Sequence, residues 1–179
     1  TGKDYGEFLC RIFDLWEADF VDGYATTSVR LFDTFSHIYL GMTPPECTVR
    51  RTCGDYLVVE HDGSVYSCDF FVEDAWHLGN ILEDDPVELL NSKRQNLFGE
   101  MKARLPAKCL KCPWLHFCRG GCIKDRIRDP RDKRFNHFCE SYRIFFAYAD
   151  QRFRKLMDGF QARQMRERQQ MYGQPHRGH

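Results

Sequence analysis

Eight of the nine cysteines in this 179-residue chain fall into two groups along the sequence. The downstream group is the more compact, since four cysteines form a Cys-x2-Cys-x5-Cys-x3-Cys run and a fifth follows after a longer gap. Thiolate sulfur is a soft ligand that suits zinc or iron–sulfur clusters, and eight thiolates are enough for two four-thiolate sites. The sequence therefore predicts metal chemistry at these residues: Cys47, Cys53, Cys68, Cys109, Cys112, Cys118, Cys122 and Cys139.

Composition excludes several other functions. Lys plus Arg and Asp plus Glu each number 26, so no net field attracts nucleic acid or an anionic membrane. No apolar run reaches the roughly 18 residues of a membrane span, and the N-terminus lacks a signal-peptide layout. We expect a soluble cytoplasmic protein with one main domain and no nucleic-acid or membrane partner. Clustered thiols in a reducing cytosol hold metal more often than they form disulfides, which remain the alternative.

Helical patterns lie on both sides of the cysteines. Apolar residues recur at helical spacing over residues 5–17, where Asp4 and Glu7 have capping-box character, and over residues 28–40. Two further helices are predicted at 86–90 and 92–105, and a final one runs from Cys139 to about residue 165. Cys10 lies inside the first helix, and we expect it to be a small buried residue without a functional role.

A hairpin is predicted just before the third cysteine. Residues 56–60 and 64–68 have strand composition and flank a His-Asp-Gly turn, in which Gly63 supplies the positive backbone angle. Pairing these strands should bring Cys53 and Cys68 to the same end of the ribbon, so local structure assembles half of one metal site. The downstream cysteine run, which contains Gly120 and Gly121, is predicted to be a loop or short turn.

The complete cysteine array is more specific than any single pair. The pattern Cys47-x5-Cys53-x9-Gly63-x4-Cys68, followed by the downstream run and Cys139, resembles the SPASM domain of radical S-adenosylmethionine enzymes. Further segments are similar to the C-terminal half of anaerobic sulfatase-maturating enzymes, and the likeness reaches about residue 157. Ile123 departs from the family, where proline is expected. The similar segments are 53–60, 66–69, 78–81, 98–99 and 120–122.

The resemblance implies a fold and a ligand assignment. The fold class is α+β, with a small hairpin-centred SPASM domain at residues 45–162 that binds two 4Fe-4S clusters and is flanked by N- and C-terminal helices. Residues 1–44 would end a truncated radical S-adenosylmethionine barrel, and residues 163–179 would be a polar, disordered tail. One cluster would be held by Cys47, Cys53, Cys68 and Cys122, and the other by Cys109, Cys112, Cys118 and Cys139.

The same resemblance implies a reaction. The family oxidises an active-site cysteine or serine of a sulfatase polypeptide to Cα-formylglycine, and the two auxiliary clusters would serve electron transfer and substrate binding. Asp69, beside Cys68, matches the family position proposed to accept the substrate proton. An external one-electron carrier such as flavodoxin or ferredoxin would be a second partner.

One family motif is absent from the sequence. No Cys-x3-Cys-x2-Cys occurs, so the third 4Fe-4S cluster and S-adenosylmethionine would belong to an N-terminal domain that this sequence lacks. The chain begins at Thr1 inside a predicted helix, and we expect a piece of a longer protein that is inactive by itself.

Other interpretations of these residues remain open. The eight thiolates could form two structural zinc sites, the chain could be a stand-alone iron–sulfur or zinc module, or it could belong to a peptide-maturing SPASM enzyme with another substrate. Asp69 could be a loop or capping aspartate. A basic stretch is typical of a solvated face and comprises Arg126, Arg128, Arg131, Lys133 and Arg134.

Overall fold

The computed structural model describes residues 1–127 and 135–172, and the chain divides into two compact units. Unit 1 contains residues 1–45 together with the chain from Glu140 onward, and unit 2 contains Glu46–Cys139. The final helix therefore groups with the N-terminal segment, whereas the sequence had assigned it to the SPASM domain. Four of the five residues in the predicted basic stretch lie outside the described residues.

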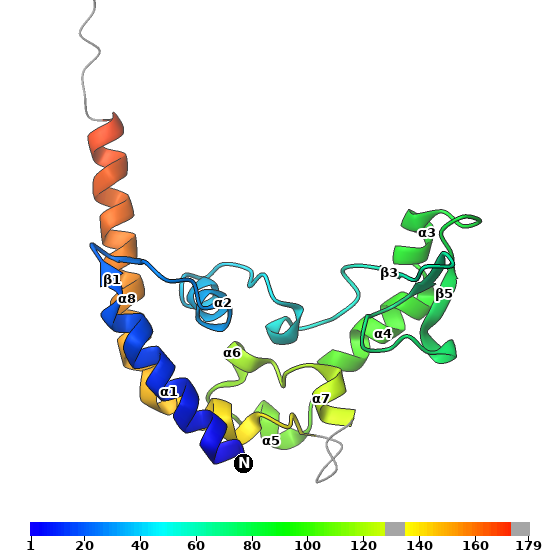
Figure 1. Cartoon of the computed structure of the whole chain (residues 1–179), viewed down its shortest axis with the longest axis horizontal. Helices are drawn as coiled ribbons and strands as arrows, with labels where there is room; N and C mark the ends of the chain where they lie inside the picture. Colours follow the sequence, from blue (N-terminus) through cyan, green and yellow to red (C-terminus); the bar gives the residue numbers. More distant parts are fainter. Residues whose placement is uncertain (128–134, 173–179) are drawn as a thin grey trace, which may run out of the picture. The chain divides into compact units, whose positions relative to one another are not determined.

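Unit 1 is built on two long helices that run side by side (Figure 1). The hydroxyl of Tyr148 donates a 2.7 Å hydrogen bond to Asp14, and the hydroxyl of Ser141 donates one of 2.8 Å to the Gly2 carbonyl. The first helix has a capping box formed by Thr1 and Asp4, three residues earlier than the predicted box of Asp4 and Glu7. The elements are α1 (Gly2–Ala18), β1 (Phe20–Val21), β2 (Tyr24–Ala25), α2 (Arg30–Tyr39) and α8 (Cys139–Tyr172).

Aromatic rings from α1, α2 and α8 make the core of unit 1. Phe13 of α1 is fully buried, and its ring centroid lies 5.6 Å from that of Phe32 and 4.7 Å from that of Phe153. Phe32 also stacks on Phe145 at 5.4 Å. Edge and stacked ring pairs at these separations add to the stabilisation from burial of the large rings. Unit 1 therefore has an apolar core built largely from aromatic rings.

Unit 2 has short elements joined by loops. Its sheet has the order β3-β4-β5, with both pairs antiparallel, and the register places Val58 opposite Tyr66 and Ser64 opposite Asn80. The elements are η1 (Cys47–Val49), β3 (Val58–Val59), β4 (Ser64–Tyr66), η2 (Asp74–Trp76), β5 (His77–Asn80), α3 (Pro86–Leu90), α4 (Lys93–Ala103), α5 (Ala107–Leu110), α6 (Leu115–Cys118) and α7 (Ile123–Ile127).

The predicted hairpin is present, and a third strand adds to it. Asp62 accepts the Ser64 amide at 2.9 Å and orders the turn. The strand β5 was not predicted from the sequence. Its contacts come from distant residues, since Asn80 donates to the Asp62 carbonyl and Arg94 of α4 donates to the His77 carbonyl. The mixed helical and small-sheet fold is confirmed. The downstream cysteine run, predicted to be a loop or short turn, includes the end of α5 and all of α6, and α7 begins directly after it.

The last helix continues past the point where the sequence predicted a disordered tail. It reaches Tyr172, and residues 173–179 lie outside the described residues. Arg163 pairs with Glu167 one turn away at 2.7 Å, and Glu167 accepts the Tyr24 hydroxyl at 3.1 Å. These contacts with the β1–β2 hairpin explain why a Gln- and Arg-rich segment stays helical. Within the described residues, no helix is both long and apolar enough to span a membrane.

Candidate metal centres

Four of the predicted ligands line one cavity in unit 2, which we call the hairpin site. Cys47, Cys53, Cys68 and Cys122 all line this cavity, although Cys68 and Cys122 are 54 positions apart in the sequence. Its remaining wall is largely aromatic and aliphatic. The other lining residues are Gly54, Tyr56, Ser67, Phe70, Phe71, Phe98 and Ile123.

The helix α4 positions the first part of the hairpin site. The amide of Cys53 donates to the Gly99 carbonyl at 3.3 Å, and a Cβ at Gly99 would overlap the Cys53 carbonyl oxygen. Buried Gln95, one turn earlier, donates to the carbonyls of Gly54 at 3.1 Å and Tyr56 at 2.9 Å. The cysteine loop is therefore held against α4 by backbone contacts that only a glycine at position 99 allows.

We refer to the remaining four predicted ligands together as the loop site. Cys109 lies in α5, Cys112 follows in a turn, Cys118 ends α6 and Cys139 begins α8. Burial raises the pKa of the Cys118 thiol to about 11, and the thiolates that add to this shift are those of Cys112, Cys109 and Cys139.

The cysteines that act on Cys53 are those of the hairpin site. Burial raises the pKa of the Cys53 thiol to about 12, and the thiolates that add to this shift are those of Cys47, Cys122 and Cys68. The structure thus places four cysteines around one cavity, while the charged neighbours of Cys118 are the other three, so the two sets are interleaved in the sequence. Cys10 lies in α1 of unit 1 and does not line the hairpin site.

A sharp reversal of the chain separates the two sites. Arg119, Gly120 and Gly121 all have positive φ angles, of 47°, 76° and 70°. A Cβ at Gly121 would overlap the side-chain amide of Asn136. Because of this turn, Cys118 lies with the loop site, while Cys122 lines the hairpin site.

Backbone amides donate hydrogen bonds to several of the sulfurs. The Gly120 amide lies 3.4 Å from the Cys118 sulfur that it donates to. The sulfurs of Cys68 and Cys122 likewise accept from the amides of Phe70 and Lys124, each two residues further along the chain. Such donors favour a thiolate, against the burial that raises the pKa of both thiols. A bound cation would complete the compensation, as expected for metal ligands.

The donor set and the walls of the hairpin site fit an iron–sulfur cluster. Four thiols face a cavity whose apolar wall includes the buried rings of Phe71 and Phe98. The Ser67 hydroxyl lines the same cavity, is 1% exposed, and finds no hydrogen-bond partner among the described residues. A sulfide of a cluster would accept such a hydroxyl. Among the described residues, no three His, Cys, Asp or Glu side chains are grouped so as to hold a single metal ion.

Asp69 is exposed at the edge of the hairpin site. Its carboxylate accepts the Tyr56 hydroxyl at 3.1 Å and the Cys68 thiol at 3.3 Å. The Tyr56 hydroxyl also lies 3.4 Å from the Cys68 sulfur. Burial, and then the bonds to Cys68 and Asp69, raise the pKa of Tyr56, so this hydroxyl stays a donor. Tyr56 therefore holds the carboxylate beside the predicted ligand.

Two buried cations lie near the thiols, and the sequence did not single them out for this position. The Lys102 ammonium donates to the Cys47 carbonyl, and the Arg126 guanidinium donates to carbonyls at the end of α4 and in the Arg119–Gly121 turn. Burial lowers the pKa of both groups, while nearby thiolates raise it. Arg126 had been predicted to lie on a solvated face.

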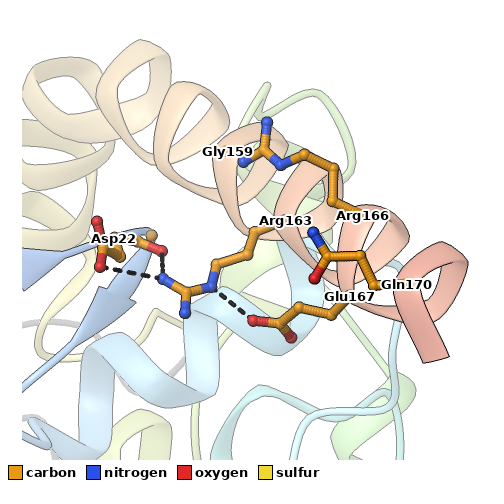
Figure 2. Close-up of a pocket in the computed structure, with 7 residues that line it drawn as sticks. Asp22, Gly159, Arg163, Arg166, Glu167 and Gln170 are labelled. Carbon is orange, nitrogen blue, oxygen red and sulfur yellow. Dashed lines mark hydrogen bonds and ion pairs between the residues drawn. The ribbon is translucent and has the colours of Figure 1, made fainter.

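A second hollow lies in unit 1 and has a different character. Figure 2 shows Arg163 of α8 directed toward Asp22 on one side and Glu167 on the other. The lining residues are Asp22, Gly23, Gly159, Arg163, Arg166, Glu167 and Gln170, so no thiol contributes. Arg163 at this hollow is already paired with Asp22 and Glu167 of the same unit. The candidate chemistry therefore lies with the cysteines of unit 2.

Comparison with known proteins supports the same location. Residues 47–113 match the SPASM family, described as an iron-sulfur cluster-binding domain. A cysteine-type anaerobic sulfatase-maturating enzyme of Clostridium perfringens (strain 13 / Type A) is 39% identical over 148 residues, which are 82% of this chain and 40% of the relative. A serine-type anaerobic sulfatase-maturating enzyme of Bacteroides thetaiotaomicron is 37% identical over 149 residues, 82% of this chain and 35% of the relative.

A solved structure agrees with these sequence relatives. Native anSMEcpe with bound AdoMet and Cp18Cys peptide has a TM-score of 0.80 and 36% identity, over 88% of this chain and 44% of that chain. The chain thus spans less than half the length of the relatives it matches. The predicted resemblance is confirmed, and the match is consistent with the C-terminal half of these proteins.

Proposed function

Because this chain carries a SPASM iron–sulfur domain and is related to the anaerobic sulfatase-maturating enzymes, we propose that it is the auxiliary-cluster portion of such an enzyme. The enzyme would oxidise a sulfatase cysteine or serine to Cα-formylglycine. Relatives of both the cysteine and serine types match at similar identity, so the proposal covers both substrates. The observation that carries it is the cavity lined by four thiols, one of which comes from the downstream cysteine run.

In this proposal the hairpin site and the loop site each hold one 4Fe-4S cluster. The interleaved grouping of the thiols supports the assignment, since Cys122 joins the three upstream cysteines and Cys139 completes the downstream set. When bound, such clusters supply one-electron acceptors. The protein contributes thiolates, amide donors to sulfur, and an apolar wall that excludes water from the hairpin site.

The proton-accepting role falls to Asp69. A substrate carbon radical must lose one electron and one proton to reach the aldehyde oxidation state, and Asp69 would take the proton beside the site that takes the electron. The Tyr56 hydroxyl on Oδ1 supports this role, because it fixes the carboxylate next to Cys68. A carboxylate held in place in this way can act as a general base.

The rest of the reaction requires parts that lie outside this sequence. A third 4Fe-4S cluster and S-adenosylmethionine would occupy an N-terminal domain, and an external one-electron carrier such as flavodoxin or ferredoxin would accept the electron. The substrate would be a sulfatase polypeptide, in line with the peptide bound to the solved relative. We expect a cytoplasmic protein, and we expect the present chain alone not to generate a radical.

Iron and sulfide analysis tests the proposal. Anaerobic reconstitution of the chain should give about eight iron and about eight sulfide per molecule, as two four-iron clusters require. One or two zinc ions without sulfide would instead establish structural zinc sites and overturn the proposal.

The role of Asp69 needs a separate test in a full-length enzyme that contains this chain. Asp69→Asn should slow product formation by more than about tenfold, the low end for a positioned acid or base. Glu73→Gln is the matched control, because Glu73 is also an exposed carboxylate of unit 2 and does not line the hairpin site. Equal turnover in the two variants would return Asp69 to a structural role.

A further inference from the structure

Two cations are buried in unit 2, where the solvent cannot offset their charge. Lys102 is 0% exposed and Arg126 is 6% exposed, although Lys and Arg are rarely fully buried without a partner. Among the described residues, neither forms an ion pair with a carboxylate, since both donate only to backbone carbonyls. Taking an ion out of water is costly, so the surroundings must supply negative charge.

The charges that face Lys102 are thiolates of the hairpin site. Its ammonium donates to the carbonyl of Cys47, and the anionic groups that act on it are Cys53, Cys47 and Cys122. The fourth member, Cys68, lines the same cavity. Lys102 therefore lies behind the wall of the hairpin site, on the side of its first two cysteines.

Arg126 faces cysteines of both sites. The thiolates that act on it are those of Cys109 and Cys118 in the loop site and of Cys53 and Cys122 in the hairpin site. Its guanidinium donates at 2.8 Å to the Gly120 carbonyl and at 2.9 Å to the Lys102 carbonyl. It thereby joins the end of α4 to the turn that separates Cys118 from Cys122.

We propose that Lys102 and Arg126 are the permanent counter-charges of the two cysteine sites, and that they make the bound clusters easier to reduce. This inference rests on the proposed function, since it assumes that the sites hold 4Fe-4S clusters. A cluster with four thiolates carries net negative charge, and reduction adds one more electron. A cation fixed nearby stabilises the reduced form more than the oxidised form and raises the potential. Lys102 acts mainly on the hairpin site, and both are positioning residues that need not touch the substrate.

The test measures the reduction potentials of the clusters in the reconstituted chain by a redox titration, in which electron paramagnetic resonance detects the reduced clusters. Lys102→Met removes the charge at similar volume, Lys102→Arg keeps it, and Lys93→Met removes an exposed charge at the start of the same helix. The Cys122→Ala chain, which should lack the hairpin cluster, assigns the two reduction steps to their sites.

Lys102→Met should lower the reduction constant of the hairpin cluster by about tenfold, a fall of about 59 mV for one electron. The reduction constant of the loop cluster should change less. In Lys102→Arg and in Lys93→Met, the reduction constant of the hairpin cluster should stay within about threefold of its value in the unchanged chain. The inference would be overturned if Lys102→Met, with full cluster content, changed the reduction constant of the hairpin cluster by less than about threefold. It would also be overturned if Lys93→Met changed that constant as much as Lys102→Met does.

Two further outcomes separate charge from packing. If Lys102→Met fails to load the hairpin cluster, Lys102→Gln provides a second neutral variant. Loss of the cluster in both neutral variants, with retention in Lys102→Arg, supports the counter-charge role. Loss in all three variants indicates a packing role and overturns it. For Arg126, Arg126→Lys should retain the reduction potentials of both clusters. A fall of about tenfold in both reduction constants, with full clusters, would contradict the role of its charge.

Iron and sulfide content distinguishes failure of this inference from failure of the proposed function. An unchanged chain that binds neither iron nor sulfide would refute the proposed function. A chain that binds both, and whose potentials do not respond to Lys102, would refute only the counter-charge inference.

Discussion

Unit 1 and unit 2 are stabilised by different kinds of contacts. In unit 1, rings from three helices pack around Phe13, and the core needs nothing beyond the chain itself. Among the described residues of unit 2, the helices other than α4 have five residues or fewer, the sheet is small, and four cysteines line one cavity. The contrast is between a unit whose core is made of packed aromatic rings and a unit, matched to an iron–sulfur cluster-binding domain, whose cysteines line a cavity.

Removal of iron and sulfide should give the largest difference between the units. Without clusters, burial still raises the pKa of Cys53 and Cys118, but no metal crosslinks the loops. Backbone amides of unit 2 should then exchange with solvent much faster, while those of α1 and α8 keep their protection. Hydrogen exchange followed by mass spectrometry measures both units in one sample. If the backbone amides of unit 2 were equally protected from exchange with and without clusters, the proposed difference in how the two units are stabilised would be wrong.

Cys122→Ala sharpens the comparison inside unit 2. The hairpin site should lose its cluster, and iron should fall from about eight to about four atoms per chain. Cys112→Ala should also retain about four iron atoms, but the remaining paramagnetic signal should be that of the hairpin cluster, because Cys112 is a predicted ligand of the loop site. Cys10→Ala, in unit 1, should keep all the iron. If Cys122→Ala instead removed the loop-site signal alone, the interleaved pairing would be wrong.

Phe13→Ala tests the core of unit 1. Truncation of a fully buried phenylalanine costs about 3–5 kcal/mol of the free energy of unfolding, because it leaves a cavity among rings that cannot close completely. Chemical denaturation followed by the helical signal measures the loss, and the iron content should not change. Leu15→Ala, at a position that is 69% exposed, should cost less than about 1 kcal/mol. Similar losses in the two variants would show that the ring cluster does not stabilise unit 1.

Asp14→Asn should give the smallest effect. The Tyr148 hydroxyl and then the Arg152 guanidinium hold the pKa of Asp14 below its ordinary value. The unfolded chain therefore binds this proton more readily, so the contribution is present above the ordinary carboxyl pKa of about 4 and is lost as pH falls toward the folded value. The side chain is 45% exposed, and solvent screening limits the contribution to less than about 1 kcal/mol.

Unfolding of Asp14→Asn and the unchanged chain at several pH values checks this sign. The difference between them should shrink as the solution becomes more acid. A difference that grew under acid conditions would contradict the assignment.

The sequence predicted the parts of the fold that depend on neighbouring residues. The turn at Asp62 and Gly63, the helices of unit 1 and the helix that begins at Pro86 follow from local pattern and were found. The cysteine spacing, together with the similar segments around it, led from the sequence to the family that the comparisons show. The ligand assignment itself remains a prediction that the grouping of the thiols supports.

Features that depend on distant contacts were not predictable in this way. Lys102 and Arg126 have ordinary helical neighbours in the sequence, and only the packed loops reveal that they are buried. The helix past Arg163 looked too polar to persist, yet Tyr24 and Asp22 from another part of unit 1 contact it. Strand β5 is likewise defined by its partners, since Gly79 and Asn80 are poor strand formers.

The reversal at Arg119, Gly120 and Gly121 limits how this protein can change over evolution. Any side chain at position 121 would collide with Asn136, and all three residues of the reversal have positive φ angles, which residues other than glycine rarely adopt. Because the reversal lies between Cys118 and Cys122, a substitution that distorts it would disturb both cysteine sets at once.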